Sequence, residues 1–181
     1  HIYPCEDISR HLYYMGGVFP APDIRTNIAV SFIGKFLTNN VHGALYGWLR
    51  EEKGWVYEVD FEYNLNKIDA GWEIQIPLNS LEEVEIVRKE IHEKIVSALK
   101  NEAHVSQEVE RRKSESVFNY QTLNDILEYA QESQLFCGAI FSEEHIRAFL
   151  DECKDTKYLM SVYEKYFSPQ VIGEFVAVPD R

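Results

Sequence analysis

Residues 57–78, with the sequence YEVDFEYNLNKIDAGWEIQIPL, carry the clearest pattern in the chain. Apolar residues occupy every second position in two runs, which are Tyr57, Val59, Phe61, Tyr63 and Leu65, then Trp72, Ile74, Ile76 and Leu78. Because successive side chains of a strand point to opposite faces, each run has one apolar face and one polar face. Residues 66–71 form a turn between the runs, so the sequence predicts an antiparallel β-hairpin.

Upstream of this hairpin, the sequence predicts one strand and two helices. The strand covers residues 8–19 and ends at a cluster of glycines and prolines. Asp23 is placed to cap the first helix, in which apolar residues recur at helical spacing as far as Leu37. A second helical stripe runs from Val41 to Leu49. Gly54 is expected to close that helix, because glycine accepts the left-handed conformation found after a last helical turn.

Downstream, helices predominate. Ser80 and Glu83 form a capping box that opens a helix running to Leu99. Further helices are expected from Ser106 to about residue 135, over residues 143–152 and over residues 156–167, before a closing strand over residues 171–178. The order β-α-α-β-β-α-α-α-α-β predicts an α+β fold with a mostly antiparallel sheet and helices packed on one face. We expect residues 1–181 to form a single domain, cut from a longer polypeptide.

The composition excludes some classes of function. Hydrophobic residues make up 45% and charged residues 27% of the chain, an ordinary globular balance. No apolar run approaches the roughly 20 residues that span a bilayer, so we expect no membrane segment. Acidic residues outnumber basic ones by 30 to 18, giving a formal charge of −12. Such a surface repels phosphate backbones, which argues against nucleic-acid binding. Its field would favour basic peptides or would simply keep the protein soluble.

The cysteines argue against a disulfide framework. Cys5, Cys137 and Cys153 are an odd set, are widely spaced and contain no C-x-x-C. Free thiols are typical of a reducing compartment, so a cytoplasmic location is expected, with a periplasmic one left open.

A search for catalytic motifs finds no active site. Zinc peptidases place two histidines and a glutamate on one helical face as H-E-x-x-H or H-x-x-E-H. His92 begins the first motif, but Val96 occupies the place of the second histidine. His145 ends the inverted motif, but Phe141 occupies its first position. One histidine supplies one of the three ligands that a catalytic zinc requires, so we assign no metal ligand to this chain.

Three carboxylates share the polar face of the first predicted hairpin strand. Glu58, Asp60 and Glu62 would lie about 7 Å apart along it, since each residue advances a strand by roughly 3.3 Å. They would bind cations or basic peptides, or form an ordinary solvated face, and spacing alone leaves both interpretations open.

The segment ALYGWLREEKGWVY, residues 44–57, ends a helix in an Arg-Glu-x-x-Gly turn and starts the next strand with tyrosine. This arrangement resembles the second-half domains of the insulinase-like, or pitrilysin-family, zinc metallopeptidases. The turn near Asp69 and Gly71, the glutamate-rich helix start at residues 106–110 and the terminal strand also fit, so the resemblance extends along nearly the whole chain.

The resemblance implies a function that this chain would perform only with a partner. In that family two homologous halves enclose an extended peptide, and zinc is bound by the half that carries H-x-x-E-H. The other half, which this chain resembles, offers an arginine and a tyrosine seven residues apart, and Arg50 and Tyr57 have that spacing. The implied substrate-binding roles are that Arg50 orients the substrate carbonyl and Tyr57 helps to stabilise its developing negative charge. The chain alone would be inactive, with zinc supplied by the partner half in cis or in trans.

Each of these residues also has a purely structural interpretation. Arg50 would complement the dipole at the end of its helix, and Tyr57 would pack in the core with its hydroxyl at the rim. The family also includes members in which both halves have lost their chemistry. A non-catalytic scaffold or interaction domain is therefore the alternative function.

Overall fold

The structure, a computed structural model, describes residues 2–6, 8–116, 127, 130, 131, 134, 135 and 138–180. The described strands are β1 (Ile2–Cys5), β2 (His11–Pro20), β3 (Asp60–Leu65), β4 (Asp69–Leu78) and β5 (Gly173–Pro179). The helices are α1 (Ile24–Thr38), α2 (Ala44–Tyr46), the π-helix η1 (Gly47–Glu52), α3 (Leu81–Leu99), α4 (Glu102–Ser116), α6 (Glu143–Glu152) and α7 (Thr156–Tyr166).

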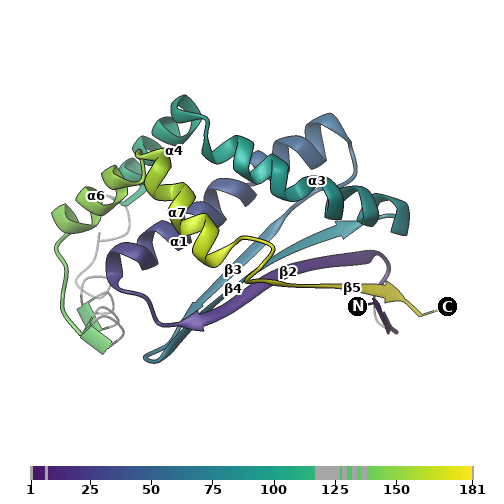
Figure 1. Cartoon of the computed structure of the whole chain (residues 1–181), viewed down its shortest axis with the longest axis horizontal. Coiled ribbons are helices and arrows are strands. Elements are labelled where there is room, and N and C mark those ends of the chain that lie inside the picture. The colour runs from purple at the N-terminus through teal and green to yellow at the C-terminus, as the bar shows by residue number, and fades with distance from the viewer. Residues whose placement is uncertain are drawn as a thin grey trace.

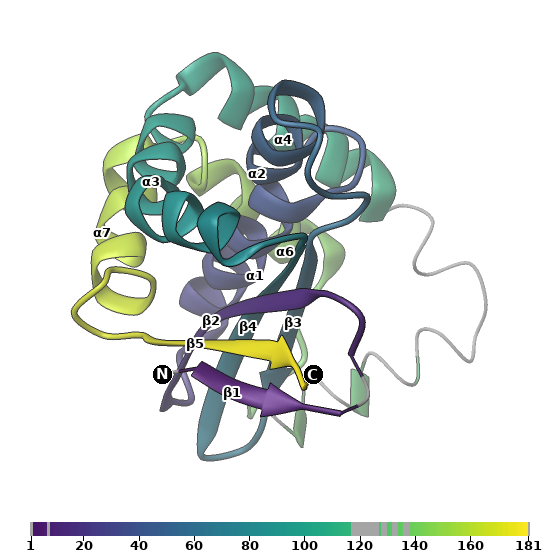
Figure 2. The ribbon, with the colours of Figure 1, turned by 90° about the vertical axis from the view of Figure 1, so that its right-hand side faces the viewer.

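The five strands form one sheet in the order β1-β5-β2-β4-β3. All neighbouring pairs are antiparallel except β1 and β5, and the predicted hairpin pairs Phe61 with Ile74 and Tyr63 with Trp72. The helices named above lie on one face of the sheet (Figures 1 and 2). The α+β class, with helices on one face of a mostly antiparallel sheet, is therefore confirmed. Strand β1 was not predicted, because it is only four residues long. Its residues are largely exposed, so buried and exposed positions do not alternate along it.

The predicted start of the hairpin was wrong. Strand β3 begins at Asp60 instead of Tyr57, and Tyr57 is 68% exposed. Val56 is buried in its place, and the backbone N–H of Val59 is bonded to Asn40 Oδ1 at 3.3 Å rather than to a neighbouring strand. The apolar alternation therefore continues past the end of the ladder. The hairpin turn is also shorter than predicted, because β4 begins at Asp69.

The predicted helix caps at Asp23, Ser80 and Gly54 are confirmed, but the Ser80–Glu83 capping box is only half formed, because the Glu83 carboxylate accepts from Asn79 N at 2.8 Å instead of from Ser80 N. The Asp23 carboxylate accepts from Thr26 N at 2.9 Å, the Ser80 hydroxyl accepts from Glu83 N at 3.2 Å, and Gly54 has a φ of 70°. The second helical stripe is shorter than predicted, because Val41 lies outside any helix and is 66% exposed.

Helix α4 begins at Glu102 instead of Ser106, because Asn101 accepts from His104 N at 3.2 Å and so caps the helix earlier. Most of the remaining predicted stretch to about residue 135 lies outside the described residues. No described helix is both long enough and apolar enough to cross a membrane.

The core lies between the helices and the covered face of the sheet. Its sheet side is formed by the buried alternation of β4, and its helix side includes Phe36 of α1, Ile91 of α3 and Phe167 after α7. Cys153 is a buried free thiol whose pKa is raised to about 12 by burial, so it is unreactive near neutral pH. Cys5 is also free, and Cys137 lies outside the described residues.

His92 is packed between α7 and β5. Its Nδ1 lies 3.0 Å from the Tyr163 hydroxyl on α7, and its Nε2 lies 3.6 Å from a Glu174 oxygen on β5. Arg88 also reaches Glu174, at 3.1 Å. Burial lowers the pKa of His92, against an opposing effect of Glu174.

We expect His92 to make folding less favourable as the pH falls below its ordinary pKa of 6.5. In that window the unfolded chain protonates His92 before the folded chain does, so the proton favours unfolding. Urea unfolding of the wild type and His92→Gln between pH 7.5 and 5 tests this. The wild type should lose more of its free energy of unfolding on acidification than the variant. Equal losses would contradict the assignment.

Candidate functional site

The structure brings Arg50 and Tyr57 into direct contact. The Arg50 Cζ atom lies 4.5 Å from the centroid of the Tyr57 ring, and Arg50 Nη1 donates to the Val56 carbonyl at 3.3 Å. Tyr57 is exposed, so its predicted alternative role as a core residue was wrong. The arginine is a half-buried side chain held by the backbone that immediately precedes the tyrosine.

An irregular helix end produces this contact. Lys53 N donates to Trp48 O at 3.2 Å, an i to i+5 bond that widens the last turn into the π-helix η1. Gly54 then takes its left-handed conformation, and Trp55 N donates back to Leu49 O at 3.0 Å. Trp48 and Leu49 are buried and anchor the turn. The chain consequently reverses sharply between Arg50 and Tyr57, which lets the two side chains meet.

A second arginine contacts the same ring. Arg10, just before β2, places its Cζ atom 5.5 Å from the Tyr57 centroid. Sequence reasoning missed Arg10, because a single arginine ahead of a strand carries no motif and its neighbourhood depends on the tertiary fold. The described ion pairs include neither Arg10 nor Arg50. The exposed site therefore combines two guanidinium groups and a phenol, all suited to bind a carbonyl or carboxylate oxygen.

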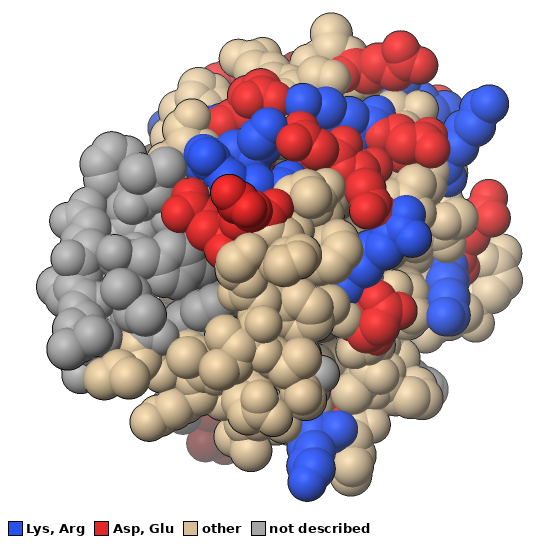
Figure 3. Space-filling model, turned by 90° about the vertical axis from the view of Figure 1, so that its left-hand side faces the viewer, with Lys and Arg blue, Asp and Glu red and all other residues tan. Residues whose placement is uncertain are grey.

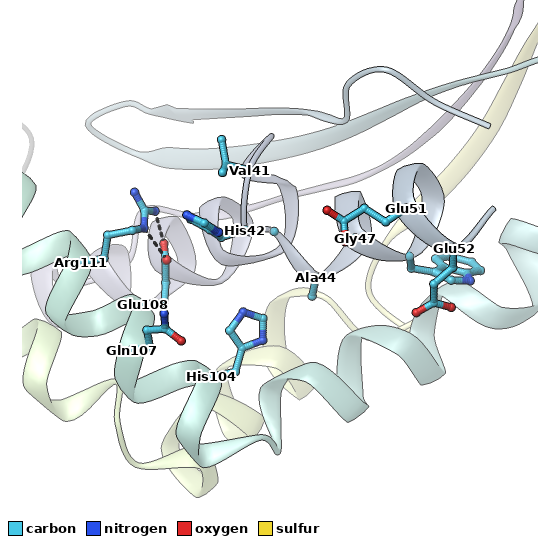
Figure 4. Close-up of a pocket in the computed structure, with 12 residues that line it drawn as sticks. Val41, His42, Ala44, Gly47, Glu51, Glu52, His104, Gln107, Glu108 and Arg111 are labelled. Carbon is cyan, nitrogen blue, oxygen red and sulfur yellow. Dashed lines mark hydrogen bonds and ion pairs between the residues drawn. The ribbon is translucent and has the colours of Figure 1, made fainter. Parts of the chain in front are cut away.

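A separate cavity of about 500 Å³ lies on the helical side of the molecule. In Figure 4, His104 and Glu108 of α4 flank it on one side, and His42 and Ala44 at the start of α2 flank it on the other. Glu108 is already paired with Arg111 at 2.7 Å. Within the described residues, no three His, Cys, Asp or Glu side chains are grouped to hold a metal. Polar and apolar residues both line this cavity, and the described ones do not form a set that would bind a particular ligand.

The predicted carboxylate face is only partly formed by a strand. Asp60 and Glu62 lie on β3, whereas Glu58 precedes the strand. Glu62 pairs directly with Glu73 of β4, and both lie on the face of the sheet opposite the helices, beside a groove of about 800 Å³. Burial and the neighbouring Glu62 raise the pKa of Glu73. Two neighbouring carboxylates make this face of the sheet electrostatically unfavourable to anions.

The second near-motif histidine has a structural role. The ring Nδ1 of His145 accepts from Ser142 N at 3.3 Å, while the Ser142 side chain accepts from His145 N at 3.3 Å. This reciprocal pair caps α6.

Charges of both signs alternate over the end of the molecule that carries α4 and α6 (Figure 3). Lys154 and Lys113 there join Glu110 and Asp151 in one network. Most of its members are exposed, so it contributes little to stability.

The family model described as the peptidase M16 inactive domain matches residues 2–116. Among solved structures, a protease from Helicobacter pylori is similar with a TM-score of 0.80 and 13% identity, over 99% of this chain and 43% of that one. A peptidase M16 inactive domain from Pseudomonas fluorescens is similar with a TM-score of 0.72 and 16% identity, over 99% and 44%.

The periplasmic protease PqqL from Escherichia coli gives a TM-score of 0.74 at 10% identity, over 99% of this chain and 20% of that one. These likenesses show the fold, and the chain spans less than half the length of each of the three proteins. No curated protein sequence matches the chain.

Proposed function

Because this chain belongs to the family of peptidase M16 inactive domains, we propose that it is the substrate-binding half of a zinc metallopeptidase. In this proposal a second, zinc-bearing half, in the same polypeptide or a separate one, completes the active site around an extended peptide. The observation that carries the proposal is the contact between Arg50 and Tyr57 at the exposed helix end.

The two side chains suit the electrostatics of peptide hydrolysis. A substrate carbonyl is neutral when it binds and gains negative charge as the peptide bond is attacked, so donors placed beforehand favour the transition state. The backbone bond to Val56 restrains Arg50, which leaves its other guanidinium N–H groups available to a carbonyl oxygen. The Tyr57 hydroxyl would donate to the same oxygen. When bound by the partner half, zinc supplies the Lewis acidity that the described residues of this chain do not.

The proposal is tested on the native assembly that contains this chain. We expect the assembly to contain zinc and to cleave unfolded peptides, to lose cleavage on treatment with 1,10-phenanthroline and to regain it on addition of Zn²⁺. This chain purified alone should cleave nothing. A zinc-free assembly that cleaves no peptide would contradict the proposal and favour a scaffold.

A further inference from the structure

Two cationic groups converge on one exposed aromatic ring in this chain. Arg50 lies 4.5 Å and Arg10 lies 5.5 Å from the centroid of Tyr57, and the two arginines come from segments far apart in sequence. Each contact is favourable on its own, because the face of an aromatic ring attracts cations. Because both Cζ atoms lie within 5.5 Å of the same ring centroid, their two positive charges repel each other, and this repulsion opposes the arrangement.

A second arginine–tyrosine contact in the same molecule differs from the one at Tyr57, because its arginine is paired with a carboxylate. Arg25 lies 4.9 Å from the centroid of Tyr158 and also forms an ion pair with Glu152. A carboxylate thus compensates the charge of Arg25. No described carboxylate lies within ion-pair distance of Arg10 or Arg50, although the chain carries a formal charge of −12.

We propose that Arg10 and Arg50 flank Tyr57 to form a subsite for a carboxylate of the bound peptide. A carboxylate accepts paired N–H bonds from guanidinium groups and would relieve the repulsion between the two arginines. The carboxylate is that of an acidic side chain or that of the C-terminus, since both present the same two oxygens. This inference rests on the proposed peptide-binding function and adds to it a preference for acidic peptides.

The preference runs against the overall charge of the chain. At long range a net charge of −12 repels acidic peptides, whereas contact with two guanidinium groups that no described carboxylate pairs with attracts them. Salt screens long-range repulsion between exposed charges more strongly than a contact at hydrogen-bond distance. The subsite should therefore still prefer the carboxylate peptide over the neutral one at an ionic strength that screens the long-range repulsion.

The test measures peptide binding to the chain by fluorescence anisotropy at 0.15 M salt, so that it does not depend on catalysis. Three labelled ten-residue peptides are compared: one with a central glutamate and an amidated C-terminus, its glutamine counterpart, and the glutamine peptide with a free C-terminal carboxylate. We expect at least one carboxylate peptide to bind about fivefold more tightly than the neutral one, as for an exposed charge-assisted contact. Which peptide gains affinity identifies the source of the carboxylate.

Two variants assign that preference to residues. Arg10→Gln should bring the ratio of the carboxylate peptide's affinity to the neutral peptide's affinity close to one. Arg25→Gln, which removes the same charge from the compensated contact, should keep the ratio. Equal binding of all three peptides by the wild type, or an unchanged ratio in Arg10→Gln, would overturn the subsite. If the chain binds the carboxylate peptide more tightly than the neutral one but its native assembly cleaves no peptide, the subsite is supported and the proposed peptidase function is contradicted.

Discussion

Arg50→Ala in the complete assembly is expected to lower kcat/KM for peptide cleavage by about 10²–10³, the usual loss when one preplaced oxyanion donor is removed. The expected loss is large because the Val56 carbonyl holds Arg50 in place against the Tyr57 ring before the negative charge develops. The measurement is steady-state cleavage of an unfolded peptide at equal zinc occupancy for wild type and variant. Most of the loss should be in kcat, because the donor acts on charge that develops only in the transition state.

Lys53→Ala is the matched control for this experiment. Lys53 follows the same π-helix and stacks over Trp55 at 5.2 Å, so its removal takes one positive charge from the same turn without touching Tyr57. We expect that variant to retain activity within about threefold of the wild type, as for an exposed cation with only a weak contact. If Arg50→Ala and the wild type were equally active, Arg50 would have no role in substrate binding and would serve only as a cation at the end of its helix.

Local patterns were sufficient to predict the hairpin and most helix starts. Alternation at period two depends only on neighbouring residues, and caps such as those of Asp23 and Ser80 are closed within four residues. The Arg50–Tyr57 pair was found by its resemblance to a family motif. Its contact depends on the left-handed conformation of Gly54, which the sequence also indicated.

Features that depend on distant segments were not predictable in this way. Alternation indicated that Tyr57 faces the core, but the strand ladder ends before it, because the Val59 N–H is bonded to Asn40 instead. The approach of Arg10 to the ring depends on where β2 begins relative to the helix end. Strand β1 pairs with β5 at the other end of the chain, so no local signal marks it.

Trp72→Ala is expected to lower the free energy of unfolding by about 3–5 kcal/mol, the range for truncating a large buried aromatic residue. Trp72 is 3% exposed, its ring stacks on Phe167 at 4.3 Å between centroids, and its Nε1 donates to Tyr166 O at 2.9 Å. This one side chain therefore joins β4 to the end of α7. Urea denaturation of the isolated chain, with fluorescence and circular dichroism compared, gives the free energy and checks that unfolding is two-state.

Two further variants separate the contributions of Trp72. Trp72→Phe keeps most of the ring stack but leaves the buried Tyr166 carbonyl without its donor, so we expect a loss of about 1–3 kcal/mol. Trp55→Ala removes an equally large side chain that is only half-buried, and its loss should be smaller than that of Trp72→Ala. If both tryptophan-to-alanine variants lost the same free energy of unfolding, the contact between β4 and α7 would not contribute more to stability than a half-buried side chain does. The difference between Trp72→Ala and Trp72→Phe instead reports the ring stack on Phe167, a long-range contact that the alternating pattern does not indicate.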